Sequence, residues 1–594
     1  MSFNVSDGAA YAVLILVCVL FTVMAIGSAG YLKCLPDAVT NCCALKIHDK
    51  EILHSADYFL SARNSAGWFA LGMSFFATGM GAWVLYGSTE LGATPQISWL
   101  GVIGYSCASA FPAVLICFLG PKIRNMSDTA FCTTDFGRKR YGRIMQLTIA
   151  AVSIFYMFIF IVAELTSISN VYALLTSNSS TTYGIIVTLI LGGFTLFYTG
   201  LAGLPASIVT DKFQGLIMVV MVILLTVAVS IEESKHVTRQ EWNLAANWTT
   251  EGLMTAVTLV IAIACAEMFN QSTWQRVWAA ESVTALRVGF LFGSVLVFIL
   301  MMFFGVMGML AYANDPEAFD NGEKWAYLGF FYLLEPLAAG WQVITLILVT
   351  ALAASSIDSL QNGLTSIFSA DIVKIGWNKK WFNRLLLVAL NAPAIWLASK
   401  KHDVISLFLV ADLVCATSVM PTFLGLQTSD LKFLKAPTEL GAFLGCVSGV
   451  VTVVVNGLIN DADGGIFDYF WLQNGAICAL CGSKTMVSFI VTPLVSAVMT
   501  YLFSYLDIRF RGDRARKPII PVPFDKDDRD THVEGSSKVD EQSADTDEKE
   551  EEGVEVAAED IDEVDEGGES VYATGFADNT TVFDHTTVPD HDQY

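Results

Sequence analysis

Residues 351–373, ALAASSIDSLQNGLTSIFSADIV, place hydroxyl groups and a carboxyl group at the end of an apolar run that begins near Trp341. The run is long enough to cross a membrane. Polar and ionisable side chains at membrane depth are costly, and they usually face a cavity or the path of an ion. The stretch therefore predicts a functional helix in an all-α membrane protein.

Four polar side chains of this stretch recur at helical spacing, and they are Ser355, Asp358, Ser359 and Asn362. Positions i, i+3, i+4 and i+7 share one face of a helix. The neighbouring hydroxyls of Ser355 and Ser356 are hard oxygen donors, which suit a small hard cation. Alternatively, the serines satisfy one another or the backbone at a contact between helices, although this explains Asp358 less well.

The composition separates a membrane body from an acidic tail. Of the 594 residues, 54% are hydrophobic and 15% are charged, which indicates a polytopic membrane protein with no nucleic-acid partner. The formal net charge is −23, but from Asp525 onward 25 Asp and Glu stand against four Lys and Arg, so the rest of the chain carries only −2. We expect residues 511–594 to form a disordered tail, because so acidic and aromatic-poor a segment cannot bury enough surface to fold alone.

Hydropathy predicts about 13 transmembrane helices. Their approximate positions are 9–30, 66–91, 97–119, 145–175, 183–203, 206–230, 253–275, 284–313, 340–372, 384–399, 403–425, 438–458 and 485–507. These spans predict four parts, which are an N-terminal helix with a cytosolic loop at 1–65, a core at 66–425, additional helices at 426–510, and the tail at 511–594.

The Lys and Arg residues predict the orientation. With the N-terminus outside, the inside loops carry 23 of them, and the outside loops carry six, which are Lys235, Arg239, Lys324, Lys400, Lys401 and Lys484. Cytoplasmic loops of membrane proteins hold an excess of positive residues. We therefore expect a multi-pass protein of the plasma membrane with its N-terminus outside and its C-terminal tail in the cytosol.

Two of the predicted spans are interrupted. The second contains SFFATGMGAW, residues 74–83, with Gly79 and Gly81 in mid-membrane, and the seventh ends in EMFNQSTWQR, residues 267–276. Broken helices at corresponding places in two halves point to the binding site of a transporter. We therefore predict two inverted five-helix repeats, at about 66–230 and 253–425. Alternatively, the glycines only allow helices to pack closely.

Four motifs follow one another along the core. They are ADYFLSARNSAGW at 56–68, YTGLAGLPASIVTDKFQG at 198–215, FNQSTWQRVWAA at 269–280 and SSIDSLQNGLTSIFSADIV at 355–373. In this order and spacing they resemble the sodium:solute symporter family, which includes sodium–glucose, sodium–proline and urea symporters. Ala202-Gly203 stands where that family usually has two glycines. The resemblance implies a leucine-transporter-like fold and a secondary active symporter that uses sodium as its coupling ion and needs no cofactor.

The resemblance also implies a sodium site between the unwound part of the first core helix and the eighth. Its ligands would be the backbone carbonyls of Ala77, Met80 and Leu352 and the hydroxyls of Ser355 and Ser356. Unwinding frees carbonyl groups, and carbonyls with hydroxyls replace the hydration shell of an alkali cation.

Asp211, in the Thr-Asp-x-x-Gln part of the second motif, resembles the acidic residue that the family places near that ion. Alternatively, Asp211 is a structural partner of Lys212 or Arg276. We expect Arg276 to anchor the cytoplasmic end of its span.

The solute should bind at the midplane, between the two broken helices. The candidate solute-binding residues are Ser74, Thr78, Gly79 and Trp83 on the first core helix and Asn270, Gln271 and Trp274 on the sixth. Asn270 matches a position that contacts solute in sugar-transporting relatives. Ordinary packing is the alternative for each tryptophan.

Several acids at membrane depth depart from the family pattern. Asp358 follows the paired serines where an uncharged residue is usual, and it is a candidate for strengthening cation binding, for carrying a coupled proton or for pairing with a cationic solute. Glu164, Glu267 and Asp412 each need a partner at that depth. Asp358 and Asp412 are the candidate coupling residues.

The sequence therefore predicts a sodium-coupled symporter, not an enzyme, for a small polar solute such as proline, another amino acid or urea. A charge that crosses the membrane yields ~2.3 kcal/mol per 100 mV, which is enough to drive uptake. Two alternatives stay open. One is a proton-coupled symporter of urea or a similar solute that uses Asp358 or Asp211, and the other is a nutrient receptor that signals through the acidic tail.

Overall fold

The computed structural model describes residues 3, 5–28, 56–126, 130–232, 237–322, 325–369, 380–400, 404–431, 434–459 and 482–516. The chain divides into two units, Met1–Val522 and Pro523–Tyr594. The expected tail at 511–594 lies outside the described residues from Lys517 onward. In the first unit, the described secondary structure is helical apart from one isolated bridge between Ala66 and Ala280.

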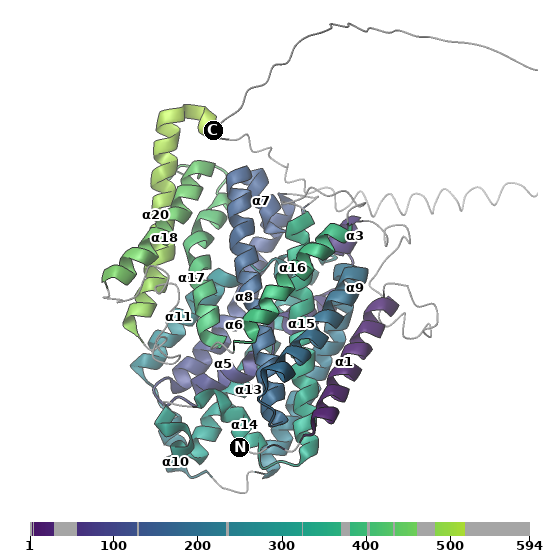
Figure 1. Ribbon diagram of the computed structural model, residues 1–594. Helices are drawn as coiled ribbons and strands as arrows, with labels where there is room; N and C mark the ends of the chain where they lie inside the picture. The colour runs from purple at the N-terminus through teal and green to yellow at the C-terminus, as the bar shows by residue number, and fades with distance from the viewer. Residues whose placement is uncertain are drawn as a thin grey trace, which may run out of the picture. The chain divides into compact units, whose positions relative to one another are not determined.

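The helices follow the chain in the order of the hydropathy pattern (Figure 1). The α-helices are α1 (Asp7–Ser28), α3 (Ala56–Ser61), α4 (Trp68–Gly79), α5 (Val84–Gly92), α6 (Ser98–Asn125), α7 (Thr133–Arg140), α8 (Arg143–Leu175), α9 (Thr181–Glu232), α10 (Arg239–Ala245), α11 (Thr250–Glu267), α12 (Gln271–Ala279), α13 (Val283–Asn314), α14 (Gly329–Leu334), α15 (Ala339–Ile367), α16 (Lys380–Ala398), α17 (Val404–Phe423), α18 (Glu439–Ile459) and α20 (Ser483–Arg511). Short 3-10 turns lie at Pro316–Gly322, Ala326–Leu328, Leu424–Leu426 and Gly512–Ala515.

Among the described helices, ten are long and apolar enough to cross a membrane, or eleven if the bent pair α4 and α5 counts as one span. Helices are expected there because a backbone in lipid has to satisfy its hydrogen bonds internally. α9 covers two of the predicted spans, since its 52 residues would measure about 78 Å unbroken, against a hydrocarbon core of about 30 Å. Gly203 interrupts it with φ +66 and ψ −157. The count of 13 spans stays a prediction.

Small residues bring α4 and α13 into close contact. A Cβ atom on Gly72 would lie 2.6 Å from the carbonyl oxygen of Gly289, and one on Gly293 would lie 2.6 Å from the carbonyl oxygen of Gly72. Such glycines let two backbones approach at a helix–helix contact in a membrane. This contact holds α4 against α13 about two turns before α4 ends at Gly79.

α15, the helix that contains the opening stretch, is the most buried of the described spans, with 83% of its apolar window inside the protein. It packs against α9, α8 and α1 (Figure 1). It also contacts α12. Every residue from Leu348 to Ile367 is buried. Its polar residues therefore face other helices, as the helical spacing predicts.

Candidate functional site

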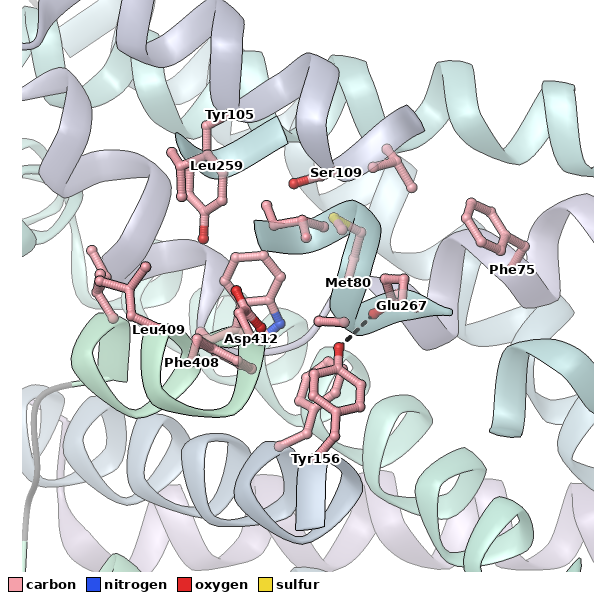
Figure 2. A pocket seen from close by; sticks show the side chains of 17 residues that line it. Phe75, Met80, Tyr105, Ser109, Tyr156, Leu259, Glu267, Phe408, Leu409 and Asp412 are labelled. Carbon is pink, nitrogen blue, oxygen red and sulfur yellow. Dashed lines mark hydrogen bonds between the residues drawn. The ribbon is translucent and has the colours of Figure 1, made fainter. Parts of the chain in front are cut away.

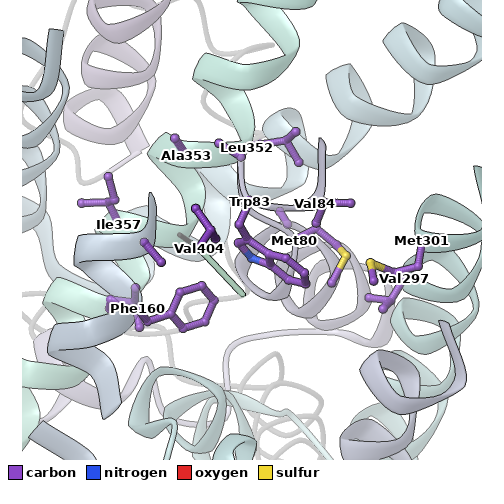
Figure 3. Close-up of a cluster of buried hydrophobic side chains, with 14 of the residues drawn as sticks. Met80, Trp83, Val84, Phe160, Val297, Met301, Leu352, Ala353, Ile357 and Val404 are labelled. Carbon is purple, nitrogen blue, oxygen red and sulfur yellow. The ribbon is translucent and has the colours of Figure 1, made fainter. Parts of the chain in front are cut away.

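The first core helix is broken at the glycine-rich segment. α4 ends at Gly79, α5 begins at Val84, and the two axes differ by 72°. Met80 leaves helical geometry with φ −108 and ψ 106. The last carbonyls of a helix lack intrahelical partners, so the break exposes oxygen atoms in the middle of the protein. Figure 3 shows Met80 and Trp83 at this break among apolar side chains of α5, α8, α13, α15 and α17.

The hydroxyl pair of α15 lies against this break. Ser356 Oγ donates to the carbonyl oxygen of Thr78 at 3.2 Å, and Thr78 Oγ1 lies 3.0 Å from Ser359 Oγ. Ser355 Oγ donates to Asp211 Oδ1 at 2.7 Å. The structure thus brings together the two segments that the sequence assigns to a sodium site. Ser356 contacts the carbonyl of Thr78. In the sequence, Thr78 lies between Ala77 and Met80, whose carbonyls are the expected ligands.

A buried ion pair lies beside these hydroxyls. Arg276 and Asp211 are both fully buried, and Arg276 Nη2 contacts Asp211 Oδ2 at 2.8 Å. The same guanidinium donates to Ser74 Oγ at 2.7 Å, to Thr78 Oγ1 at 2.6 Å and to Ser359 Oγ at 2.7 Å. Arg276 therefore ties the last turn of α12 to α4, α9 and α15. Asp211 is a structural partner of Arg276, as the alternative interpretation of the sequence expected. Burying a guanidinium costs free energy. Here one carboxylate and three side-chain hydroxyls compensate that cost.

Asp358 points to α9. Its Oδ2 accepts a hydrogen bond from Tyr198 Oη at 2.6 Å, and its Oδ1 accepts from Ser207 Oγ at 2.9 Å and from Ser359 Oγ at 3.1 Å. With Asp211 and Arg276, the cluster holds two carboxyl groups and one guanidinium. Tyr198 and Ser207 both lie in the motif at 198–215, but the sequence offered no signal that they would pair with Asp358.

The second predicted break also occurs. α11 ends at Glu267, and α12 begins at Gln271. Asn270 caps α12, because its Oδ1 accepts from the backbone N–H of Ser272 at 3.2 Å, and its Nδ2 donates to Glu267 Oε2 at 3.1 Å. Asn270 thus positions a carboxylate at the end of α11.

Gln271 and Trp274 point elsewhere. Gln271 exchanges hydrogen bonds with Thr133 of α7 and donates to Ser153 of α8 at 2.9 Å. Trp274 Nε1 donates to the carbonyl of Met268 at 2.9 Å, and its ring stacks on Phe423. Neither lines the cavity described next, and both hold α12 in place.

A cavity lies between the break of the first core helix and α6, α8, α11, α13 and α17 (Figure 2). The predicted solute residues Gly79 and Trp83 line it, whereas Ser74 and Thr78 belong to the ion-pair cluster. Its volume is about 60 Å³, measured as space open to the centre of a water molecule. On that scale one water takes about 10–15 Å³, so the cavity has room for about four to six waters or an aminoalkyl group.

The cavity has aromatic walls and two acids. The acids are Glu267 and Asp412, and the rings that line the cavity are those of Phe75, Trp83, Tyr105, Tyr156, Phe160 and Phe408. Figure 2 shows Tyr156 donating to Glu267, at 2.8 Å between Oη and Oε1. Asp412 is buried, with only 4% of its surface exposed. Within the described part of the chain, it nevertheless accepts no hydrogen bond and forms no ion pair. Asp412, one of the two coupling candidates from the sequence, lines the cavity and has no contact with the ion-pair cluster among the described residues.

Glu164 of α8 contacts the break of the first core helix. Its Oε2 accepts a hydrogen bond from the backbone N–H of Ala82 at 2.9 Å. A Cβ atom on Gly81 would lie 1.3 Å from Glu164 Oε1, so only glycine leaves room for this carboxyl group. The second glycine of the break therefore admits an acid, a role that the sequence does not reveal.

Replacement of Gly81 by alanine is expected to destabilise the protein and to lower uptake, because the methyl group displaces a buried carboxyl group. Overpacking of this kind costs about 1–3 kcal/mol. The melting temperature of the purified protein and its solute uptake in proteoliposomes measure the two effects. Gly193→Ala is the matched control, since a Cβ atom at that exposed position of α9 meets nothing within 4 Å. Wild-type stability and uptake in Gly81→Ala would show that Glu164 has room to move away.

Comparisons with known proteins identify the family of this chain. The profile of the sodium:solute symporter family matches residues 58–449. The spermidine transporter DUR31 of Candida albicans is 26% identical over 511 residues, covering 82% of this chain and 92% of that protein. The sodium/sialic acid symporter NanT of Aliivibrio fischeri is 21% identical over 450 residues, covering 68% of this chain and 87% of the symporter.

Among solved structures, the substrate-bound, outward-open state of a sodium-coupled sialic acid symporter matches with a TM-score of 0.61 and 15% identity. The match covers 84% of this chain and 97% of that one. This likeness shows the fold, which is leucine-transporter-like, as predicted. Because the family profile spans the broken helices, the hydroxyl pair and the ion-pair cluster together, this chain belongs to the sodium:solute symporter family and is a multi-pass membrane transporter, not an enzyme.

Proposed function

We propose that this symporter couples sodium to the uptake of an amine cation of the polyamine class. The observation that carries this proposal is the pair of acids, Glu267 and Asp412, in a cavity whose other lining residues are aromatic or apolar except Ser109. The sequence by itself favoured proline, another amino acid or urea, and those solutes are the competing outcomes of the experiment below.

Charge balance in the cavity favours a cation. Burying an ionised carboxylate is costly unless a positive partner compensates it. Glu267 receives hydrogen bonds only from neutral donors, which are Tyr156, Asn270 and Thr273, and Asp412 has no partner among the described residues. An ammonium group on the solute would supply the missing charge, and the rings of Trp83 and Phe408 would stabilise it through cation–π contacts.

The relatives distinguish two kinds of solute. DUR31 is a spermidine transporter, and spermidine is a flexible chain of amine groups. NanT is a sialic acid symporter, and sialic acid carries a carboxylate that two cavity acids would repel. The charge of the cavity therefore supports a solute like that of DUR31.

For the coupling ion, we propose a site formed by the carbonyls of Ala77, Met80 and Leu352 and the hydroxyls of Ser355 and Ser356. The contact of Ser356 with Thr78 supports this assignment, because it puts a hydroxyl next to the exposed end of α4. Asp211 lies one hydrogen bond away, on Ser355, and would hold that hydroxyl in place.

We also propose the parts and the orientation that the sequence predicts. Residues 66–425 would form the core, with inverted repeats at about 66–230 and 253–425, and residues 426–510 would add peripheral helices. The protein would lie in the plasma membrane with its N-terminus outside and its tail in the cytosol. Sodium binding at the break would complete the neighbouring solute cavity, since Met80 lines that cavity and is also an expected sodium ligand.

Ser355→Ala and Ser356→Ala are each expected to raise the sodium concentration for half-maximal uptake by about tenfold. The reason is the loss of one oxygen ligand, of order 1.4 kcal/mol, which corresponds to a factor of ten. Sodium titration of uptake in proteoliposomes measures this shift. Ser448→Ala on the peripheral helix α18 is the control, because its hydroxyl bonds only to the carbonyl of Leu444. Unchanged sodium dependence in both variants would remove these serines from the ion site.

The function itself is tested by uptake into proteoliposomes that hold the full-length chain. Labelled spermidine, putrescine, proline, urea and sialic acid are each offered under an inward sodium gradient, a choline gradient and a proton gradient. Uptake of the amines that needs sodium supports the proposal. Uptake of proline or urea would restore the solute expected from the sequence, and uptake driven by protons without sodium would favour the proton-coupled alternative.

A chain truncated after Lys517 that keeps uptake would exclude a receptor that depends on its tail.

A further inference from the structure

A second cavity lies at the end of the bundle where α7 and the C-terminal end of α20 meet (Figure 1). Its volume is about 300 Å³, measured as space open to the centre of a water molecule, which corresponds to about 20 to 30 waters. The charged residues that line this basic cavity are Arg140, Arg511, Arg514, Arg516, Asp430 and Glu439. None of them lines the solute cavity, so the basic cavity is a separate site.

The described side chains give the basic cavity an excess of positive charge. Four arginines and two acids line it, which leaves two positive charges. Lys435 and Asp507 each bond to a lining residue, and the excess does not change, because their charges are opposite. A concave site lined by charges of one sign attracts ions of the other sign. The basic cavity therefore suits an anion.

Two of the four arginines are held by carboxylates. Arg516 Nη2 contacts Asp430 Oδ2 at 2.8 Å, and Arg511 Nη2 contacts Asp507 Oδ2 at 2.7 Å. Arg514 is exposed, and it forms no ion pair or hydrogen bond with the side chains that the structure describes. Its guanidinium is therefore available to an anion.

Arg140 is buried, at 6% exposure, and within the described part of the chain it has no carboxylate partner. Its Nε donates to the carbonyl of Gly425 at 2.6 Å, and its Nη2 donates to those of Gln427 and Pro437, both at 3.0 Å. Its Nη1 donates to none of the described residues. The carbonyls fix the guanidinium in place but leave its charge unpaired, and a buried charge is costly without a partner of opposite sign.

The basic cavity lies at the depth of lipid headgroups. α20 has 29 residues and measures about 43 Å, against about 30 Å for the hydrocarbon core and about 40–45 Å for a bilayer with its headgroups. One face of α20 carries exposed apolar side chains at every fourth position, and they are Val498, Leu502, Leu506 and Phe510. Phe510 immediately precedes Arg511, so this lipid-facing stripe reaches the edge of the basic cavity.

We propose that the basic cavity binds the phosphate group of an anionic phospholipid, held by the guanidiniums of Arg140 and Arg514. A guanidinium matches the geometry of phosphate oxygens and donates two parallel hydrogen bonds to them. Basic pockets between membrane helices bind lipid headgroups for this reason. A free phosphate ion offers the same oxygens, but the stripe on α20 favours the lipid, because acyl chains would lie along it. This site needs neither the proposed solute nor the proposed coupling ion.

The experiment is native mass spectrometry of the full-length protein, purified in a neutral detergent and freed of copurified lipid. The protein is titrated with phosphatidic acid, whose headgroup is a bare phosphate, and with phosphatidylcholine of the same acyl chains. The wild type is expected to bind phosphatidic acid at least about tenfold more tightly. Arg514→Gln is expected to weaken binding of phosphatidic acid at least about tenfold, because one charged donor is lost, and to leave binding of phosphatidylcholine unchanged.

Arg509→Gln is the matched control, since it removes the same charge from an exposed position near the end of α20 that does not line the basic cavity. It should bind phosphatidic acid as the wild type does. An equal loss in Arg509→Gln and Arg514→Gln would show general attraction by charge and would overturn the site. The melting temperature of Arg514→Gln without lipid shows that this variant is folded.

Two further outcomes need no variant. Equal binding of phosphatidic acid and phosphatidylcholine by the wild type would overturn the proposal. Inorganic phosphate at equal ionic strength is expected to bind at least about a hundredfold more weakly than phosphatidic acid, because it has no acyl chains to bury. Inorganic phosphate that binds as tightly as phosphatidic acid would overturn the lipid as the ligand.

Discussion

Uptake of spermidine driven by sodium is expected to fall at least about a hundredfold in the double variant Glu267→Gln with Asp412→Asn. Each carboxylate is proposed to hold an ammonium group, and a hydrogen bond to a charged group is worth about 1.5–3 kcal/mol. Two such losses amount to about 3–6 kcal/mol, where 1.4 kcal/mol is a factor of ten. Initial rates of uptake at several solute concentrations measure the loss.

The single variant Asp412→Asn separates binding from folding. Asp412 is buried and has no partner among the described residues, so its neutralisation is expected to raise the melting temperature of the protein without solute while it weakens amine binding. Glu267→Gln should not raise the melting temperature in the same way, because Tyr156 and Asn270 already donate to that carboxylate. Spermidine uptake that survives the double variant would exclude these acids as the amine site.

Loss of the buried ion pair is expected to have the largest effect on stability. Removing one partner of such a pair costs about 3–5 kcal/mol, since the other charge stays buried without compensation. We therefore expect Arg276→Gln to yield little folded protein, because Asp211 keeps its charge and Ser74, Thr78 and Ser359 each lose a donor. Yield after size-exclusion chromatography and the melting temperature of the purified protein measure this loss.

A second change on the other side of the pair tests the cause. The double variant Asp211→Asn with Arg276→Gln removes both charges and is expected to recover part of the lost stability. Arg516→Gln is the control, because its pair with Asp430 is exposed and such pairs contribute about 0–1 kcal/mol. If Arg276→Gln were as stable as Arg516→Gln, the cluster would not hold α12 to α4, α9 and α15.

The candidate site was predicted in part. Paired hydroxyls in one apolar helix and glycines in a second can be recognised from the sequence, because both are unusual in the middle of a membrane span. The resulting expectation that residues near 78 and 355 meet agrees with the contact between Ser356 and the Thr78 carbonyl. The local sequence does not show that Arg276 bonds to side chains of α4, α9 and α15, because those residues lie 65 to 202 positions away along the chain.

The solute residues show the same limit. Gly79 and Trp83 line the cavity as expected, but Gln271 and Trp274 bind the surrounding helices instead. Their polar atoms are equally suited to a solute and to a neighbouring helix. Only the direction of the side chain decides between the two, and that direction follows from the break at 268–270.

The sequence alone determines that this chain crosses a membrane many times, that two of its helices are broken, and which family it belongs to. These properties are local, since they depend on the hydropathy of about 20 consecutive residues and on motifs along one segment. Tertiary structure alone decides which acid meets which partner. Glu164 reaches Ala82 across 82 positions, and Asp211 reaches Arg276 across 65. Such pairings depend on how the helices pack. The packing therefore decides which charges lie together at the ion site, in the solute cavity and in the buried pair.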